Sequence, residues 1–103
     1  MPEALVGRFE DLVPGSATRV EVDDLVLAVV RIGDEVFAIA DRCSHEDFPL
    51  SEGEVFEPEC ELECARHGAS FDLRTGAPCS LPATVAVATY PTVVRDGEVW
   101  VHW

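Results

Sequence analysis

The sequence contains no lysine, and its seven basic side chains are all arginines, set against 20 acidic residues. The formal net charge of −13 makes the surface repel nucleic acids and anionic membranes, so neither is expected as a partner. No apolar segment of this sequence approaches the roughly 20 residues that cross a bilayer. The first residues also lack the basic and apolar regions of a secretory signal. These absences predict a cytoplasmic protein whose acidic surface attracts a partner with a basic patch.

No linker, internal repeat or low-complexity tract divides the 103 residues, so we expect one domain over 1–103. A sustained helical period is also missing, whereas β-type segments alternate with turn signals such as Asp23-Asp24, Gly33-Asp34 and Asp96-Gly97. The pattern predicts an all-β chain, a small antiparallel β-sandwich, with strands at 18–22, 25–32, 36–40, 85–90, 92–94 and 99–103.

The middle of the chain, about 41–82, has few β-branched residues and is rich in Glu, Pro, Gly and Cys. Long irregular stretches in compact domains usually carry function. This one holds all four cysteines and two of the three histidines. We therefore expect a β-scaffold at about 1–40 and 83–103 that presents an inserted, loop-rich binding subdomain.

Two short motifs in that subdomain combine a thiol with an imidazole. The first is Cys43-Ser44-His45, and the second, after residues 46–63, is Cys64-Ala65-Arg66-His67. Thiolate and imidazole ligands together suit zinc, copper and iron–sulfur clusters. Structural zinc sites usually pair ligands at C-x₂₋₄-C and H-x₃₋₅-H spacings. One residue between Cys43 and His45 is tight for a single zinc ion, but a zinc-stabilised binding module remains an alternative.

With these motifs the chain resembles the Rieske ferredoxin family, in which two His replace two Cys on one iron of a [2Fe–2S] cluster. Residues 68–76 and the segment 77–83, which looks like the family's cluster-covering proline loop, extend the resemblance over most of the chain. It implies the Rieske fold and one [2Fe–2S] cluster per chain. It also implies that Cys43 and Cys64 bind the buried iron and that His45 and His67 bind the outer iron.

Four positions depart from the high-potential members of the family. Those proteins carry a disulfide where this chain has Phe48 and Arg66, and hydroxyl side chains where it has Ala69 and Phe71. Hydrogen bonds to cluster sulfur raise the potential, and nearby negative charge lowers it. Acidic residues are dense between the two motifs, so we expect a midpoint potential nearer ~−150 mV than +300 mV.

The resemblance implies a soluble one-electron carrier without turnover of its own. Its expected partners are a flavin-dependent reductase and a terminal oxygenase of the aromatic-ring dioxygenase type, both with basic docking patches, and a monomer is expected. Two alternatives keep the cluster: a protein of iron–sulfur assembly, or the small subunit of nitrite reductase.

Three remaining residues could also serve metal chemistry. Cys60 and Cys79 could form a redox pair or supply a further ligand, but free cysteines are commonly buried and inert. We interpret both as partly buried small residues. His102 is an isolated histidine near the C-terminus and is expected at the surface or in packing.

Overall fold

The long apolar segment of the sequence forms the central strand of the structure, a computed structural model that describes residues 2–44, 48–66, 68–81 and 83–103. This strand, β3, spans Leu25–Ile32 and lies in an antiparallel sheet of order β2-β3-β4-β8. The other members of this sheet are β2 (Ser16–Val22), β4 (Glu35–Ala40) and β8 (Thr89–Tyr90).

Both faces of this central sheet are covered, which is why its strands carry continuous apolar runs. Leu27 and Val29 of β3 face one hydrophobic cluster together with Val99 and Val101. Ala28, on the opposite face, enters a second cluster with residues of the binding region. The sheet therefore belongs to two cores at once.

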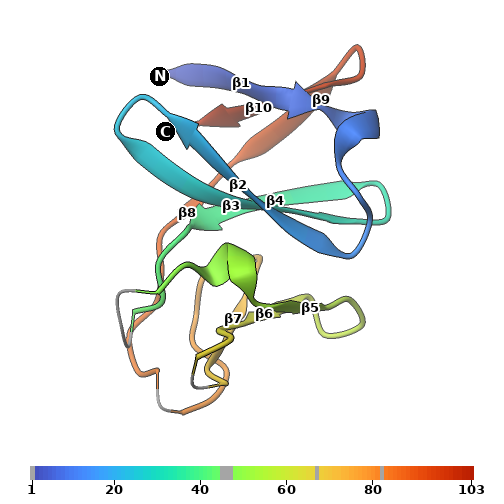
Figure 1. The fold of residues 1–103 in the computed structure, drawn as a ribbon. Coiled ribbons are helices and arrows are strands. Elements are labelled where there is room, and N and C mark those ends of the chain that lie inside the picture. The colour runs from blue at the N-terminus through green and yellow to red at the C-terminus, as the bar shows by residue number, and fades with distance from the viewer. Residues whose placement is uncertain (1, 45–47, 67, 82) are drawn as a thin grey trace.

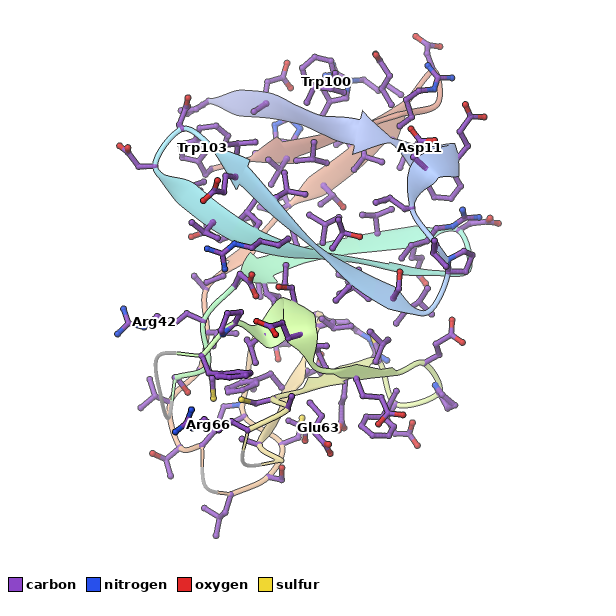
Figure 2. All side chains as sticks on the ribbon, viewed as in Figure 1. Asp11, Arg42, Glu63, Arg66, Trp100 and Trp103 are labelled. Atoms are coloured by element: carbon purple, nitrogen blue, oxygen red, sulfur yellow. The ribbon has the colours of Figure 1, made fainter. Side chains whose placement is uncertain are left out.

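A three-stranded sheet covers the first face in the order β1-β10-β9. It pairs the N-terminal strand with the C-terminal one and places both termini at one end of the molecule (Figure 1). Trp100 and Trp103 lie at that end (Figure 2). Its strands are β1 (Glu3–Arg8), β9 (Thr92–Arg95) and β10 (Glu98–His102).

The third sheet, of order β5-β6-β7, lies beyond the second face of the central sheet, at the opposite end from the termini (Figure 1). Each of its strands is only three residues long: β5 (Glu54–Phe56), β6 (Glu61–Glu63) and β7 (Ser70–Asp72). Two 3₁₀ turns complete the elements, η1 (Phe9–Asp11) and η2 (Leu50–Glu52). In the described part of the chain, no helix is long and apolar enough to cross a membrane.

The all-β antiparallel fold confirms the predicted fold class, and the expected turns are present. Asp96 and Gly97 both have positive φ, as the hairpin between β9 and β10 requires. The strand predicted at 85–90 is wrong in its first part, because only Thr89–Tyr90 pairs in a sheet. The backbone N–H of Val87 instead donates to the carbonyl of Gly76 in the binding region at 2.9 Å. The division of the chain at 40/41 and 82/83 stays a prediction.

Candidate metal centre

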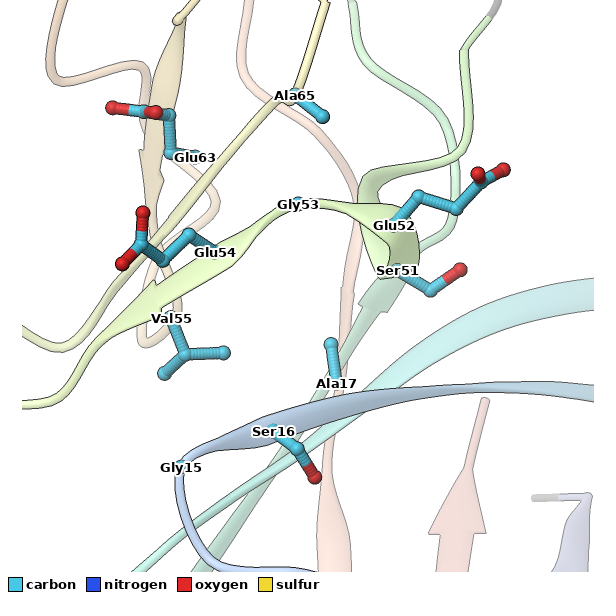
Figure 3. Close-up of a pocket in the computed structure, with 10 residues that line it drawn as sticks. All are labelled: Gly15, Ser16, Ala17, Ser51, Glu52, Gly53, Glu54, Val55, Glu63 and Ala65. Atoms are coloured by element: carbon cyan, nitrogen blue, oxygen red, sulfur yellow. The ribbon is translucent and has the colours of Figure 1, made fainter.

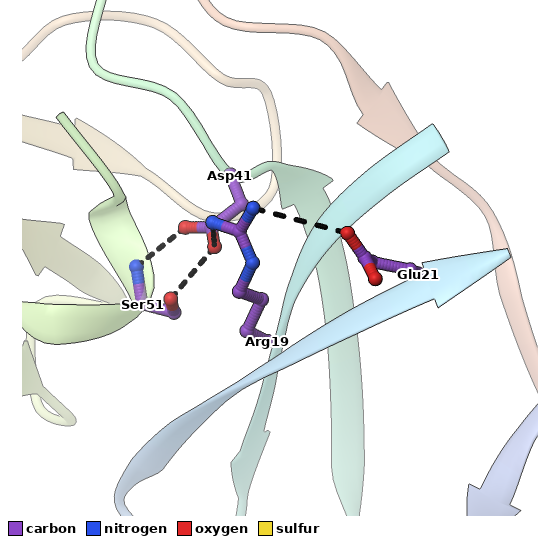
Figure 4. A network of polar contacts seen from close by, with 4 residues as sticks. All are labelled: Arg19, Glu21, Asp41 and Ser51. Carbon is purple, nitrogen blue, oxygen red and sulfur yellow. Dashed lines mark hydrogen bonds and ion pairs between the residues drawn. The ribbon is translucent and has the colours of Figure 1, made fainter. Parts of the chain in front are cut away.

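Cys43 follows the end of β4 and comes two residues after Asp41, whose hydrogen bonds anchor this part of the chain. The backbone N–H of Asp41 donates to Val26 of β3 at 2.9 Å. Its fully buried carboxylate accepts hydrogen bonds from the N–H and hydroxyl of Ser51, at 2.6 and 2.7 Å, and pairs with Arg19 at 3.2 Å (Figure 4). This network ties the exit of β4 to η2, so the first ligand segment leaves the sheet in a fixed direction.

Two closed loops hold the candidate sulfur ligands. The N–H of Cys43 donates to Phe48 at 3.0 Å and closes the first loop. In the second loop, the N–H of Cys64 donates to Ala69 at 2.6 Å, and Cys64 accepts from Gly68 at 3.0 Å. Gly68 adopts a φ of 75°, a left-handed conformation that favours glycine. The two loops are the ones that contain His45 and His67, which themselves lie outside the described residues.

The two cysteines lie in the same hydrophobic core although 20 residues separate them in the sequence. Cys43 is 2% exposed and Cys64 is fully buried, and neither forms a disulfide. Ala69 and Phe71, both fully buried, belong to the same core. Two free thiols in an apolar, water-poor site suit soft metal ligation by thiolates, since burial shields the metal from solvent.

Phe48 and Arg66 bring the two loops into contact. The guanidinium carbon of Arg66 lies 5.9 Å from the centroid of the Phe48 ring, within the range of a cation–π contact. These are the positions at which the resemblance places a disulfide in high-potential proteins. In this protein a non-covalent contact between Arg66 and Phe48 therefore takes the place of that disulfide.

The segment 77–80 runs antiparallel beside β7 and covers the second loop. Asp72 donates its N–H to Ala77 at 2.9 Å, and Cys79 donates its N–H to the carbonyl of Ser70 at 2.7 Å. Beyond it, Leu81 is 79% exposed. That the segment 77–83 is a cluster-covering proline loop stays a prediction, and we call the described residues 77–81 and 83–87 the covering loop.

Hydroxyl groups, which the sequence reasoning did not identify, tie the covering loop to both ligand loops. Ser80 Oγ accepts the N–H of Ser70 at 3.0 Å and lies 3.0 Å from Ser70 Oγ and 3.4 Å from the carbonyl of Gly68. Ser44 Oγ donates to the carbonyl of Val85. The only sequence signal was the position of Ser44 between two candidate ligands.

The two remaining cysteines differ in exposure. Cys60 is buried, 5% exposed, as expected, and adopts a φ of 57°. Cys60 raises the pKa of the Arg74 guanidinium, mainly through a side-chain hydrogen bond and then through electrostatic attraction. The expectation that Cys79 is partly buried is wrong, because it lies on the exposed covering loop. Desolvation and then the carboxylate of Glu61 raise the pKa of its thiol.

Charge is unevenly distributed around the binding region. A cleft of about 620 Å³ between β2 and β5 is lined by Glu52, Glu54 and Glu63 (Figure 3). Arg42 and Arg66 lie beside the ligand loops (Figure 2). His102 lies on β10, with its Nε2 3.6 Å from the carboxylate of Glu3.

Comparisons with known proteins identify the family. The sequence matches the Rieske [2Fe–2S] domain over residues 3–91. It is 42% identical, over 98% of this chain and 94% of the relative, to the 3-phenylpropionate/cinnamic acid dioxygenase ferredoxin subunit of Photorhabdus laumondii. The ferredoxin of carbazole 1,9a-dioxygenase from Nocardioides aromaticivorans superposes with a TM-score of 0.95 and 39% identity, covering 98% of this chain and 97% of that one. A chain from a complex of reduced oxygenase and oxidized ferredoxin in carbazole 1,9a-dioxygenase has a TM-score of 0.89 and 38% identity, over 96% of this chain and 100% of that chain. This chain therefore belongs to the Rieske [2Fe–2S] family.

Proposed function

We propose that this protein is a Rieske ferredoxin that passes single electrons to a terminal oxygenase. One [2Fe–2S] cluster per chain follows from the family, and we assign Cys43, His45, Cys64 and His67 as its ligands. The carrying observation is that Cys43 and Cys64 reach one buried apolar core from two separately closed loops. Each loop also contains one of the two proposed histidine ligands.

The chain supplies burial and a fixed frame to this cluster. When bound, the cluster accepts and releases one electron. Leu62 and Phe71, both fully buried, exclude water on the protein side of the thiols. Backbone hydrogen bonds from Cys43 and Cys64 hold the ligand loops closed. A held frame keeps ligand movement small when the charge of the cluster changes, which favours rapid electron transfer.

The proposed acceptor follows from the relatives, which are named as ferredoxin subunits of dioxygenases or occur with an oxygenase. A flavin-dependent reductase is the proposed donor, and both partners are expected to present basic patches to this acidic chain. Attraction of that kind weakens with ionic strength because salt screens exposed charges. We further propose that the protein works as a monomer in the cytoplasm.

The proposal is tested first on protein purified without oxygen. Iron and sulfide are quantified, and the dithionite-reduced sample is studied by electron paramagnetic resonance (EPR). We expect two irons, two sulfides and a spectrum whose average g value lies below that of all-cysteine ferredoxins. Cys64→Ser should abolish the signal, whereas the matched control Cys79→Ser should keep it, because Cys79 lies on the exposed loop.

Electron delivery is tested separately with a reductase and an aromatic-ring dioxygenase. NADH-dependent product formation that requires the ferredoxin supports the proposal. A colourless zinc protein would refute the cluster assignment. A Rieske spectrum without delivery to any dioxygenase tested would refute only the assigned acceptor and favour the assembly or nitrite-reductase alternative.

A further inference from the structure

Ser80 joins the covering loop to the second ligand loop and to the first residue of β7 through three contacts. Its Oγ accepts the N–H of Ser70 at 3.0 Å, lies 3.0 Å from Ser70 Oγ and is 3.4 Å from the carbonyl of Gly68. One proton arrangement satisfies all three contacts: Ser80 accepts both Ser70 donors and donates to Gly68. Because Ser70 is 7% exposed, water replaces these bonds poorly.

Gly68 is thereby held through both of its peptide groups. Its N–H donates to Cys64 at 3.0 Å, and its carbonyl faces the Ser80 hydroxyl. Gly68 directly follows the proposed ligand His67 in the sequence. A hydroxyl of the covering loop therefore restrains the backbone next to a proposed ligand.

Ser44 makes the corresponding contact on the other side. It lies between Cys43 and the proposed ligand His45, and its hydroxyl donates to the carbonyl of Val85. Ser44 and Ser80 thus attach the covering loop at two points, one to each ligand loop.

Among the described residues between these two points, Ala83 alone packs into the core: it is 4% exposed and belongs to the cluster of Cys43 and Cys64. Leu81 is 79% exposed and Val85 is 62% exposed, and Thr84 is also exposed. No disulfide joins the ligand loops, since all four cysteines are free. Ser44 and Ser80 supply side-chain hydrogen bonds that link this loop to the ligand loops, beside the backbone bond from Cys79 to Ser70 at 2.7 Å.

We propose that Ser44 and Ser80 are positioning residues: their side-chain hydrogen bonds hold both ligand loops against the covering loop and so control the retention and the geometry of the cluster. The inference rests on the proposed ligand set. Cluster loss requires local opening of these loops, and its rate follows the population of the open state when closing is fast. Loss of one neutral hydrogen bond raises that population about fivefold.

The test compares Ser80→Ala, Ser44→Ala and the double variant as cluster-loaded proteins. Bleaching of the visible absorbance in excess chelator should accelerate about fivefold in Ser44→Ala, which loses one hydrogen bond, and by more than that in Ser80→Ala, which loses three contacts. In the double variant the two factors should multiply. The EPR lines of the reduced cluster should broaden, because a looser frame spreads the ligand geometry. Hydrogen exchange of the Ser70 amide should accelerate in Ser80→Ala but not in Ser44→Ala.

Two controls separate positioning from a general loss of stability. Ser16→Ala removes a comparable hydroxyl-to-carbonyl bond, 2.7 Å to Val13, that does not join a ligand loop to the covering loop, and should leave bleaching and EPR lines unchanged. Ser80→Thr retains the hydroxyl and should restore wild-type behaviour. Unchanged bleaching in both alanine variants, or equal acceleration in Ser16→Ala, would refute the positioning role of Ser44 and Ser80 while leaving the proposed function intact. A wild-type protein that binds no cluster would overturn both.

Discussion

Asp41 should be a sensitive position outside the proposed ligand set. Its carboxylate is fully buried and accepts two hydrogen bonds from Ser51, at 2.6 and 2.7 Å (Figure 4). Hydrogen bonds to a charged group contribute about 1.5–3 kcal/mol each, so Asp41→Ala should lower the free energy of unfolding by about 3 kcal/mol or more. For a domain of this size that corresponds to a fall in Tm of about 12 °C or more.

Substitutions of the residues around Asp41 should destabilise the protein to different, graded extents. Ser51→Ala removes only the hydroxyl bond to this charged group and should cost about 1.5 kcal/mol or more, or about 6 °C or more. Arg19→Gln should cost less than about 1 kcal/mol, because the Arg19 side chain is 48% exposed. Glu21→Ala is the matched control: this carboxylate lies 4.0 Å from the same arginine but is 70% exposed, so Tm should hardly change.

The assay is thermal unfolding of the loaded protein at one fixed scan rate, followed by circular dichroism and by the visible absorbance of the cluster. Because Asp41 lies two residues before Cys43, cluster bleaching should shift together with unfolding. If Asp41→Ala melted within a few degrees of Glu21→Ala, the reasoning from buried hydrogen bonds would be refuted.

Three further outcomes are expected. Ala69→Ser places a hydroxyl in the buried core that holds the proposed ligands Cys43 and Cys64. A hydrogen bond from this hydroxyl to cluster sulfur should raise the midpoint potential, measured by voltammetry, by about 40 mV, equivalent to about 1 kcal/mol, and a fall would contradict the argument. Gly53→Ala should lower Tm far more than Gly33→Ala, since a Cβ at Gly53 would lie 1.7 Å from the Glu63 carbonyl oxygen whereas a Cβ at Gly33 has nothing within 4 Å. Equal losses of Tm would refute that steric reading. Glu61→Gln should lower the pKa of the Cys79 thiol toward its ordinary value and so speed its labelling by a disulfide reagent at pH 8 severalfold; an unchanged rate would show that the carboxylate is not a cause.

The scaffold was largely predictable because its signals are local. The segment Leu25–Ile32 is apolar on both faces, and its strand runs between two covered layers. The turn at Asp96-Gly97 needs two positive φ values, which this dipeptide supplies at low cost. Such features depend on neighbouring residues and are visible in the sequence.

The strands of the third sheet were not predictable from propensity. Glu61–Glu63 alternates two glutamates with one leucine, and each of the three strands is only three residues long. Short segments of this kind gain their stability from the core below them, where Leu62 and Phe71 are fully buried. The strand at Glu3–Arg8 was also missed, because its pairing partner lies at the far end of the chain.

The candidate site also has a part that the sequence predicts and a part that only the folded structure shows. Spacing in the sequence indicates the cysteine and histidine motifs, because metal ligation constrains which residue types recur at short intervals, and the ligand set stays a prediction. The network of Asp41 and the contacts of Ser80 join segments ten or more residues apart, and only the folded chain shows them. Serine and aspartate are common surface residues, so the burial of Asp41 and Ser70 cannot be predicted from the sequence.

The way the ligand loops are joined has a consequence for how the protein is assembled. A disulfide between the loops would need an oxidant to form, whereas the contact of Arg66 with Phe48 and the hydrogen bonds of Ser44 and Ser80 form on folding alone. Each is weak, so the loops can open locally without unfolding of the central sheet, which has its own second core. Opening of these loops should then release the cluster while the scaffold stays folded. Cluster retention should therefore be more sensitive than overall stability to the loss of single hydroxyl groups.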